Sequence, residues 1–142
     1  MKKFYSMSVL FSFVLFAGCS KDVLKNYDDR IIGTWNITEV NSIGIGRSNS
    51  NNLPFTSGRF TFFENGTLNY VNGANVNFRG TWDIQRKVIG EETVRGLELT
   101  AIDFANQQVL SEYYDDMIFT GTDRFKASVT TGTRTYVTRF SR

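Results

Sequence analysis

The chain has 142 residues and no His, with 16 Lys and Arg against 14 Asp and Glu. Because Lys2 and Lys3 lie in a segment that we expect to be removed, the mature domain is neutral, which argues against nucleic acid as a partner. Without His the chain lacks the usual acid–base group at neutral pH and the commonest metal ligand. We therefore expect a protein that is not an enzyme and that holds neither a metal nor a cofactor.

The first 18 residues are predicted to be a secretory signal peptide. A basic start at Lys2 and Lys3 precedes an apolar run from Phe4 to Ala17. This run falls short of the ~20 apolar residues that span a bilayer, which favours a cleaved signal over a membrane helix that stays attached.

The only cysteine, Cys19, follows directly after Leu15-Phe16-Ala17-Gly18. Small residues before a lone Cys at the end of a signal peptide resemble the lipobox of bacterial lipoproteins. The resemblance implies that Cys19 is lipidated on its sulfur after cleavage, and that Ser20 directs the protein to the outer membrane, on its periplasmic face or at the cell surface. Residues 19–30 then form the lipidated cysteine and a polar tether, and residues 31–142 form the folded domain.

The first predicted strand, Ile31 to Val40, alternates an apolar face with a mostly polar one. Trp35 lies on the apolar face with Gly33 two residues before it, and the burial of an indole is worth about 4 to 6 kcal/mol at most. The same phrase returns at Gly80-Thr81-Trp82-Asp83-Ile84. We expect both tryptophans to be buried at matching places.

Residues 41–57 are predicted to form a long surface loop, since they are rich in Asn, Ser and Gly and hold the only proline. Four apolar residues lie in this loop: Ile43, Ile45, Leu53 and Phe55. They either form a lid over a cavity or pin the loop to the side of the domain. Loops of this length in small domains are often functional, so this loop is the expected site of specificity.

The residues from Gly58 to Asn72 are predicted to form a hairpin, for which two registers are open. A two-residue turn at Asn65-Gly66 mixes apolar and polar residues on each face. A three-residue loop, Glu64 to Gly66 with Gly66 left-handed, gathers the apolar residues on one face. We predict this second register, which pairs Phe60 with Tyr70 and Phe62 with Leu68.

The rest of the chain has the pattern of short strands separated by turn signals. Residues 76–85 give the longest two-residue alternation, and residues 87–96 are a loop or an extended hairpin. A change of face predicts a bulge at residues 101–103, and residues 108–119 are expected to form one strand. No helical period appears outside the signal. Strands that follow one another by hairpins predict an all-β domain, a small antiparallel up-and-down β-barrel of about eight strands.

Together these motifs resemble the lipocalin-like lipoproteins of Bacteroidetes, a calycin-type family of barrels. The resemblance rests on Ile32-Gly33-Thr34-Trp35, on Phe62 to Thr67, on Gly80-Thr81-Trp82 and on the late Arg139. It implies that Trp35 lies at a closed end of the barrel, with an arginine of the last strand packed across the indole. Arg139 is expected in that place, with Arg142 or Arg134 as alternatives. It also implies that residues 41–57 lie at the open mouth.

Three pairs of neighbouring carboxylates are the groups that an enzyme would use: Asp28-Asp29, Glu91-Glu92 and Asp115-Asp116. Because neighbours on a strand point to opposite faces, the two members of a pair cannot share a substrate. We expect these acids to be solvated.

The inner wall of the predicted barrel carries aromatic side chains, which suit either a filled core or a pocket. We expect a non-catalytic recognition or assembly module, held to the membrane by its lipid, that contacts an envelope protein through the loop at residues 41–57. The alternative is that the barrel binds a small hydrophobic ligand along its inner wall, at Phe60, Phe62, Tyr70, Phe78 and Trp82.

Overall fold

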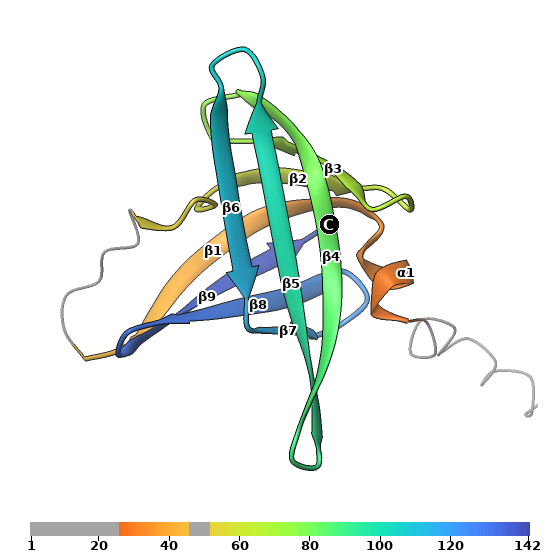
Figure 1. The fold of residues 1–142 in the computed structure, drawn as a ribbon, viewed down its shortest axis with the longest axis vertical. Coiled ribbons are helices and arrows are strands. Elements are labelled where there is room, and N and C mark those ends of the chain that lie inside the picture. The colour runs from red at the N-terminus through yellow and green to blue at the C-terminus, as the bar shows by residue number, and fades with distance from the viewer. Residues whose placement is uncertain (1–25, 46–51) are drawn as a thin grey trace, which may run out of the picture.

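The computed structural model describes residues 26–45 and 52–142. These residues form one short helix, α1 (Tyr27–Ile31), and nine strands in a single antiparallel sheet (Figure 1). The strands are β1 (Gly33–Gly44), β2 (Gly58–Phe62), β3 (Thr67–Val71), β4 (Asn77–Ile89), β5 (Glu92–Asp103), β6 (Gln108–Tyr114), β7 (Asp116–Phe119), β8 (Arg124–Thr131) and β9 (Arg134–Ser141). The predicted all-β class is confirmed. The predicted signal peptide, Cys19 and most of the tether lie outside the described residues.

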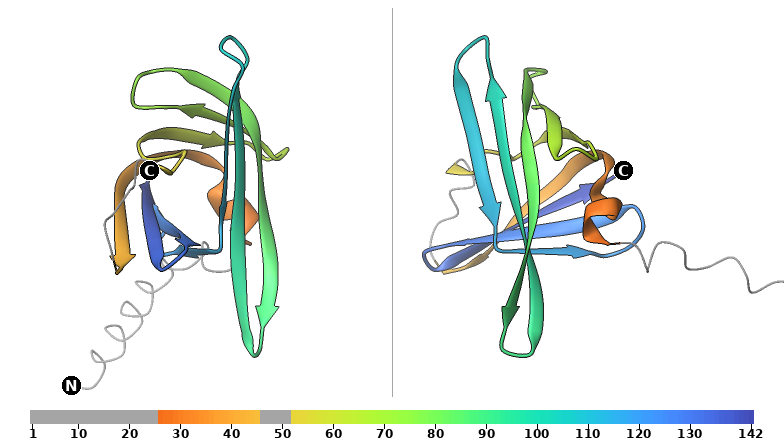
Figure 2. Two further views of the ribbon diagram at one scale, coloured as in Figure 1. Left: turned by 60° about the vertical axis from the view of Figure 1, so that its left-hand side comes forward. Right: turned by 45° about the vertical axis from the view of Figure 1, so that its right-hand side comes forward.

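Strands that are neighbours in the chain are also neighbours in the sheet, except β6 and β7, which lie at its two edges. The order is β6-β5-β4-β3-β2-β1-β9-β8-β7, so the first strand pairs with the last. The sheet coils so strongly that β4, β5 and β6 stand across β8 and β9 (Figure 2). The hydrophobic core fills the space that the coiled sheet encloses.

The prediction of a closed barrel is wrong, because β6 and β7 do not pair and the sheet stays open between them. Only Asp115 separates these two strands, which is too short a connection for the chain to fold back as a hairpin. Residues 108–119, predicted as one strand, instead form β6 and β7, and the chain changes direction in a corner at Asp115. The Asp115 carboxylate holds this corner against β8 by accepting a hydrogen bond from the Thr130 N–H at 2.9 Å.

The predicted register of the first hairpin is confirmed. Phe60 pairs with Tyr70 and Phe62 pairs with Leu68, and Gly66 has a φ of 78°. Residues 87–96 belong to an extended hairpin of β4 and β5, which is one of the two predicted forms.

The predicted bulge at residues 101–103 is wrong, since β4 and β5 pair without a shift through this region. Asp103 points inward, where its carboxylate accepts the N–H of Ala105 at 2.9 Å and so caps the next turn, while Phe104 is 72% exposed. The pairing of β1 with β9 does shift, between Ile37 and Glu39.

Helix α1 forms where no helix was expected, in residues assigned to the tether and to the first strand. Its first turn carries Asp28 and Asp29 and its last turn carries Arg30, which suits the helix dipole. Five residues are too few for a helix that is stable alone, so packing must hold it. Ile31 is fully buried and thereby joins α1 to the core.

The substitution Gly66→Ala is expected to lower the free energy of unfolding by about 1 kcal/mol, because an L-residue is strained at this positive φ. The nearest atom to an added Cβ is the carbonyl oxygen of Trp82 at 3.7 Å, so the loss would come from backbone conformation and not from a clash. Gly121→Ala is the control, since its Cβ would meet nothing within 4 Å and its φ is not left-handed. Equal midpoints of urea unfolding for the two variants would contradict the prediction.

Candidate functional site

Strand β1 runs from one end of the domain to the other and defines both. After the ends of the predicted barrel, we name α1, the start of β1 and Arg142 the closed end, and Ile43, Gly44 and the start of β9 at Arg134 the open end. The 12 residues of β1 correspond to roughly 36 Å of strand. Figure 1 shows α1 and the end of β1 on opposite sides of the sheet.

Trp35 is the centre of the closed end. Its side chain is fully buried, and its indole Nε1–H donates a hydrogen bond to the Ile31 carbonyl at 2.6 Å. The Phe125 ring meets the indole edge-on at 4.8 Å between centroids, and the Arg142 guanidinium lies 4.2 Å above it. Such a cation–π contact contributes about 0.5 to 2 kcal/mol.

The prediction that Arg139 packs across Trp35 is wrong, and Arg142, one of the alternatives, occupies this place. Arg142 also donates hydrogen bonds to the carbonyls of Ile32, Arg30 and Thr122 and lies 3.5 Å from the Asp123 carboxylate. Arg139 instead points outward, 3.4 Å from the Glu39 carboxylate.

A polar hollow of about 550 Å³ opens beside Arg142, between α1 and the turn from β7 to β8. Arg30, on its wall, donates a hydrogen bond to the Gly121 carbonyl at 2.9 Å and lies 4.0 Å above the Phe119 ring. Both arginines are thus engaged with the protein itself. The two arginines on its wall therefore have a structural role in holding α1 and the β7–β8 turn together.

The environment of Trp82 differs from that of Trp35, although both residues lie in the same sequence motif, Gly-Thr-Trp. It is half-buried, and its Nε1–H donates to the Phe63 carbonyl at 3.0 Å. The two glycines also differ: Gly33 has a φ of 118°, whereas a Cβ at Gly80 would collide with the backbone of Thr100. The expectation of two equivalent buried tryptophans is therefore wrong.

The interior is filled by aromatic rings in contact. A continuous chain of ring contacts, with centroid distances of 4.3 to 6.1 Å, runs through the interior across the strands. Its members, in order, are Trp35, Phe125, Phe140, Phe60, Tyr70 and Phe78. Phe62 stacks on Phe60 at 5.5 Å and meets Trp82 edge-on at 5.8 Å. We name this set the aromatic column.

Burial shifts the pKa of three acidic side chains that face the interior. Burial raises the pKa of Tyr70 to about 12, and its hydroxyl donates to the Ser57 carbonyl at 2.6 Å. Burial also raises the pKa of Tyr114. The pKa of Glu112, which is half-buried on β6, is raised by desolvation as well. In each case the loss of solvation on burial is the largest cause of the shift.

The four apolar residues of the predicted loop at 41–57 divide into two kinds. Phe55 is fully buried, with its ring edge-on to Phe60 and Tyr70 at 5.2 and 5.0 Å, and Leu53 packs against the core. Ile43 and Ile45 are 67% and 89% exposed.

The first part of this predicted loop is not a loop. Residues 41–44 continue β1 and pair with β9, while residues 46–51 lie outside the described residues. The open end therefore presents Ile43 on the last residues of β1 and Ile45 directly after the strand. Leu53 and Phe55 pin the chain to the domain, which is one of the two predicted roles. Ile43 and Ile45 remain available for contacts.

The three carboxylate pairs lie on different elements of the fold. Asp28-Asp29 is on α1, Glu91-Glu92 is at the tip of the β4–β5 hairpin, and Asp115-Asp116 is at the corner between β6 and β7. Within the described ranges, no group of three or more acidic, His or Cys side chains is placed to hold a metal ion.

Comparisons of the chain with protein-family models, with curated proteins and with solved structures give no match. In the described ranges, 26–45 and 52–142, no helix has the length and apolar character needed to cross a membrane.

Removing the guanidinium by Arg142→Gln is expected to lower the free energy of unfolding by roughly 1 to 3 kcal/mol, because it leaves three carbonyls and the Trp35 ring without their cation. The matched control is Arg139→Gln, whose exposed ion pair is worth about 0 to 1 kcal/mol. Urea unfolding monitored by tryptophan fluorescence measures both. A larger loss for Arg139→Gln would contradict the assignment of Arg142.

Proposed function

We propose that this chain is a lipoprotein of the outer membrane, whose lipocalin-like domain acts as a non-catalytic recognition or assembly module. Its contacts with an envelope protein are made at the open end, through Ile43 and Ile45. The lipocalin-like resemblance implies an arginine of the last strand across Trp35, and the arginine in contact with the indole, Arg142, follows directly after β9.

The aromatic column favours recognition at the surface over binding in the interior. Phe60, Phe62 and Phe78, three of the side chains that would line a ligand cavity, are at most 1% exposed and contact other rings. A hydrophobic ligand would have to separate these rings, each pair of which contributes about 0.5 to 1.5 kcal/mol beyond its buried area. Recognition of a partner at the surface requires no such rearrangement of the rings.

The observation that carries the proposal is the exposure of Ile43 and Ile45 at the end of β1 farthest from α1. The tether predicted at residues 19–30 leads into α1, so an anchor at Cys19 would hold the closed end within roughly 29 Å of the bilayer, the span of eight extended residues. The open end is then directed away from the membrane. Two exposed isoleucines in that position are suited to a protein contact.

Replacing the lone thiol by Cys19→Ala is expected to leave the protein uncleaved or soluble, because the sulfur is the predicted lipid attachment site. Membrane fractionation and the intact mass of the purified chain measure this. A variant that is still processed and still sediments with the outer membrane would rule out the anchor.

The double variant Ile43→Asn/Ile45→Asn is expected to lose the contact with the envelope partner and keep its melting temperature, since both side chains are exposed. The matched control is Val88→Asn/Ile89→Asn, which removes two exposed apolar residues, 68% and 64%, from the β4–β5 tip. A photo-crosslinking amino acid at position 45 or 89 in cells reports the contact directly.

Crosslinks from position 45 that vanish with Ile43→Asn are expected, with none from position 89. Equal crosslinking from both positions would contradict the open end as the site. A small apolar molecule retained in native mass spectrometry, and lost with a charged residue at position 78, would replace the proposal with the interior site.

A further inference from the structure

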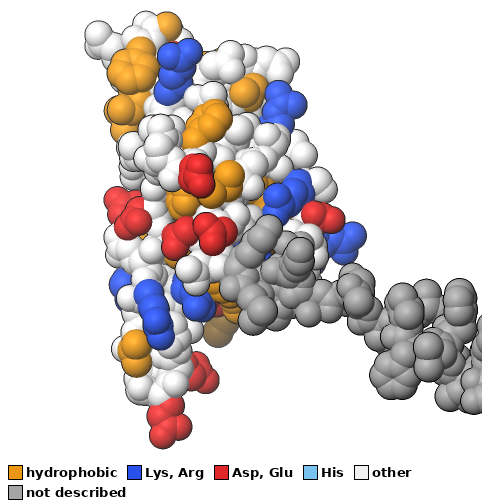
Figure 3. Space-filling model, turned by 90° about the vertical axis from the view of Figure 1, so that its right-hand side faces the viewer, with side chains coloured by type: hydrophobic (Ala, Val, Ile, Leu, Met, Phe, Trp, Pro, Cys, Tyr) orange, Lys and Arg blue, Asp and Glu red, His pale blue; other side chains and the backbone are white. Residues whose placement is uncertain are grey.

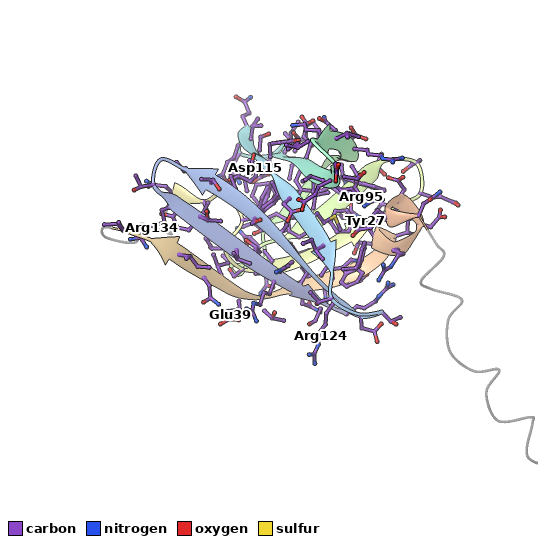
Figure 4. The ribbon with its side chains drawn as sticks, turned by 90° about the horizontal axis from the view of Figure 1, so that it is seen from below. Tyr27, Glu39, Arg95, Asp115, Arg124 and Arg134 are labelled. Atoms are coloured by element: carbon purple, nitrogen blue, oxygen red, sulfur yellow. The ribbon has the colours of Figure 1, made fainter. Side chains whose placement is uncertain are left out.

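A second hollow, of about 510 Å³, lies on the outer side of the sheet where β1, β9 and β8 pair. Four charged side chains line it: Glu39, Arg124, Lys126 and Arg139. We name it the basic hollow. Glu39 and Arg124 are labelled in Figure 4, where both project from the same side of the sheet.

The register shift in β1 builds one wall of the basic hollow. Trp35 and Ile37 point inward, and an unbroken alternation would turn Glu39 inward as well. The shift between Ile37 and Glu39 places Glu39 on the outer face, opposite Arg139. The Thr38 hydroxyl donates a hydrogen bond to the Arg139 carbonyl at 3.2 Å and ties the shifted residue to β9.

Three cations stand side by side in the basic hollow without enough acids to balance them. Lys126 pairs directly with Arg139 across β8 and β9, and Arg124 lies two residues away on the same face of β8. Like charges directly opposite on a sheet destabilise it. The only carboxylate, Glu39, is engaged with Arg139, and neither Arg124 nor Lys126 forms an ion pair with any residue that the structure describes.

Another cationic pair, Arg86 opposite Arg95 on β4 and β5, has a partner within the protein, because the Arg95 guanidinium lies 4.0 Å above the Tyr27 ring. On the face shown in Figure 3, acidic and basic side chains are interspersed, with apolar ones between them. The mature chain as a whole is expected to be neutral, whereas the basic hollow carries three cations against one carboxylate. Folding does not account for this local cost, and a bound anion would.

We propose that the basic hollow binds a phosphate group carried by a larger molecule. Guanidinium groups match phosphate oxygens in geometry as well as charge, and Arg124 and Arg139 offer two of them around the Lys126 ammonium. The hydroxyls of Thr120 and Ser141 line the same hollow and supply further donors. Its volume suits a phosphorylated small molecule or head group better than a bare ion.

The basic hollow adjoins the closed end of the domain. Thr120 and Arg124 flank the turn whose Gly121 carbonyl accepts a hydrogen bond from Arg30 of α1. If the chain is anchored as proposed, a lipid head group is within reach of this side. The assignment of the phosphate itself does not depend on the anchor, because a soluble phosphorylated molecule meets the same side chains.

The test is a titration of the full chain, purified in a non-ionic detergent, with inorganic pyrophosphate, followed by NMR of backbone amides. Saturable shifts are expected around residues 126 and 139. Arg124→Gln/Lys126→Gln is expected to weaken binding about tenfold, and Glu39→Gln to strengthen it about threefold by removing the only carboxylate. The matched control Arg79→Gln/Arg86→Gln removes two exposed charges from β4 and is expected to change affinity less than about twofold.

Equal weakening by the two double variants would mean that net charge alone attracts the anion, and would overturn the proposal. Unchanged or weaker binding by Glu39→Gln would overturn it as well. The source of the phosphate is separated by repeating the measurement in micelles doped with phosphatidylglycerol or with phosphatidylcholine. Shifts of the same amides with phosphatidylglycerol alone assign a membrane head group, shifts with pyrophosphate alone assign a soluble molecule, and shifts with neither overturn the site.

Discussion

The burial of the Trp35 indole is the constraint on which the rest of the structure depends. An indole N–H taken out of water requires an acceptor, and the Ile31 carbonyl supplies it, which holds α1 against β1. Arg142 covers the same ring, so the two ends of the described domain meet on one side chain. The same two ends are joined by the pairing of β1 with β9. The sheet is continuous where β1 pairs with β9. Its two edges are β6 and β7, which the chain connects through Asp115 without a turn.

The two-residue alternation was enough to predict the inward face of Trp35 and the register of the first hairpin, because both depend on local pattern and on the left-handed Gly66. The corner at Asp115 is also visible in the spacing of the apolar residues around it. Tyr114 and Met117 are both buried although they are three positions apart, and residues at that spacing point to opposite faces of one straight strand. Helix α1 left no periodic signal, because tertiary contacts and not its own sequence hold five residues in a helix.

The candidate sites depend on register, which the sequence alone does not reveal over long separations. Lys126 and Arg139 are neighbours only because β8 pairs with β9, and a neutral composition conceals the excess charge that results. The shift in β1 likewise turns Glu39 toward Arg139, which leaves the place over Trp35 to Arg142. The exposure of Ile43 follows from the extension of β1 along β9, where a pattern of Asn, Ser and Gly predicts a loop.

The position of β1 has a mechanical consequence. A single covalent strand joins the end that carries α1 to the end that presents Ile43. If a tether pulls on the first end while a partner holds the second, the tension runs along the backbone of β1. The ladders to β2 and β9 would then be loaded in shear, with many hydrogen bonds sharing the force, and would not be peeled apart one at a time. The domain would behave as a stiff link between two moving bodies, with the coiled remainder of the sheet carrying little of the load.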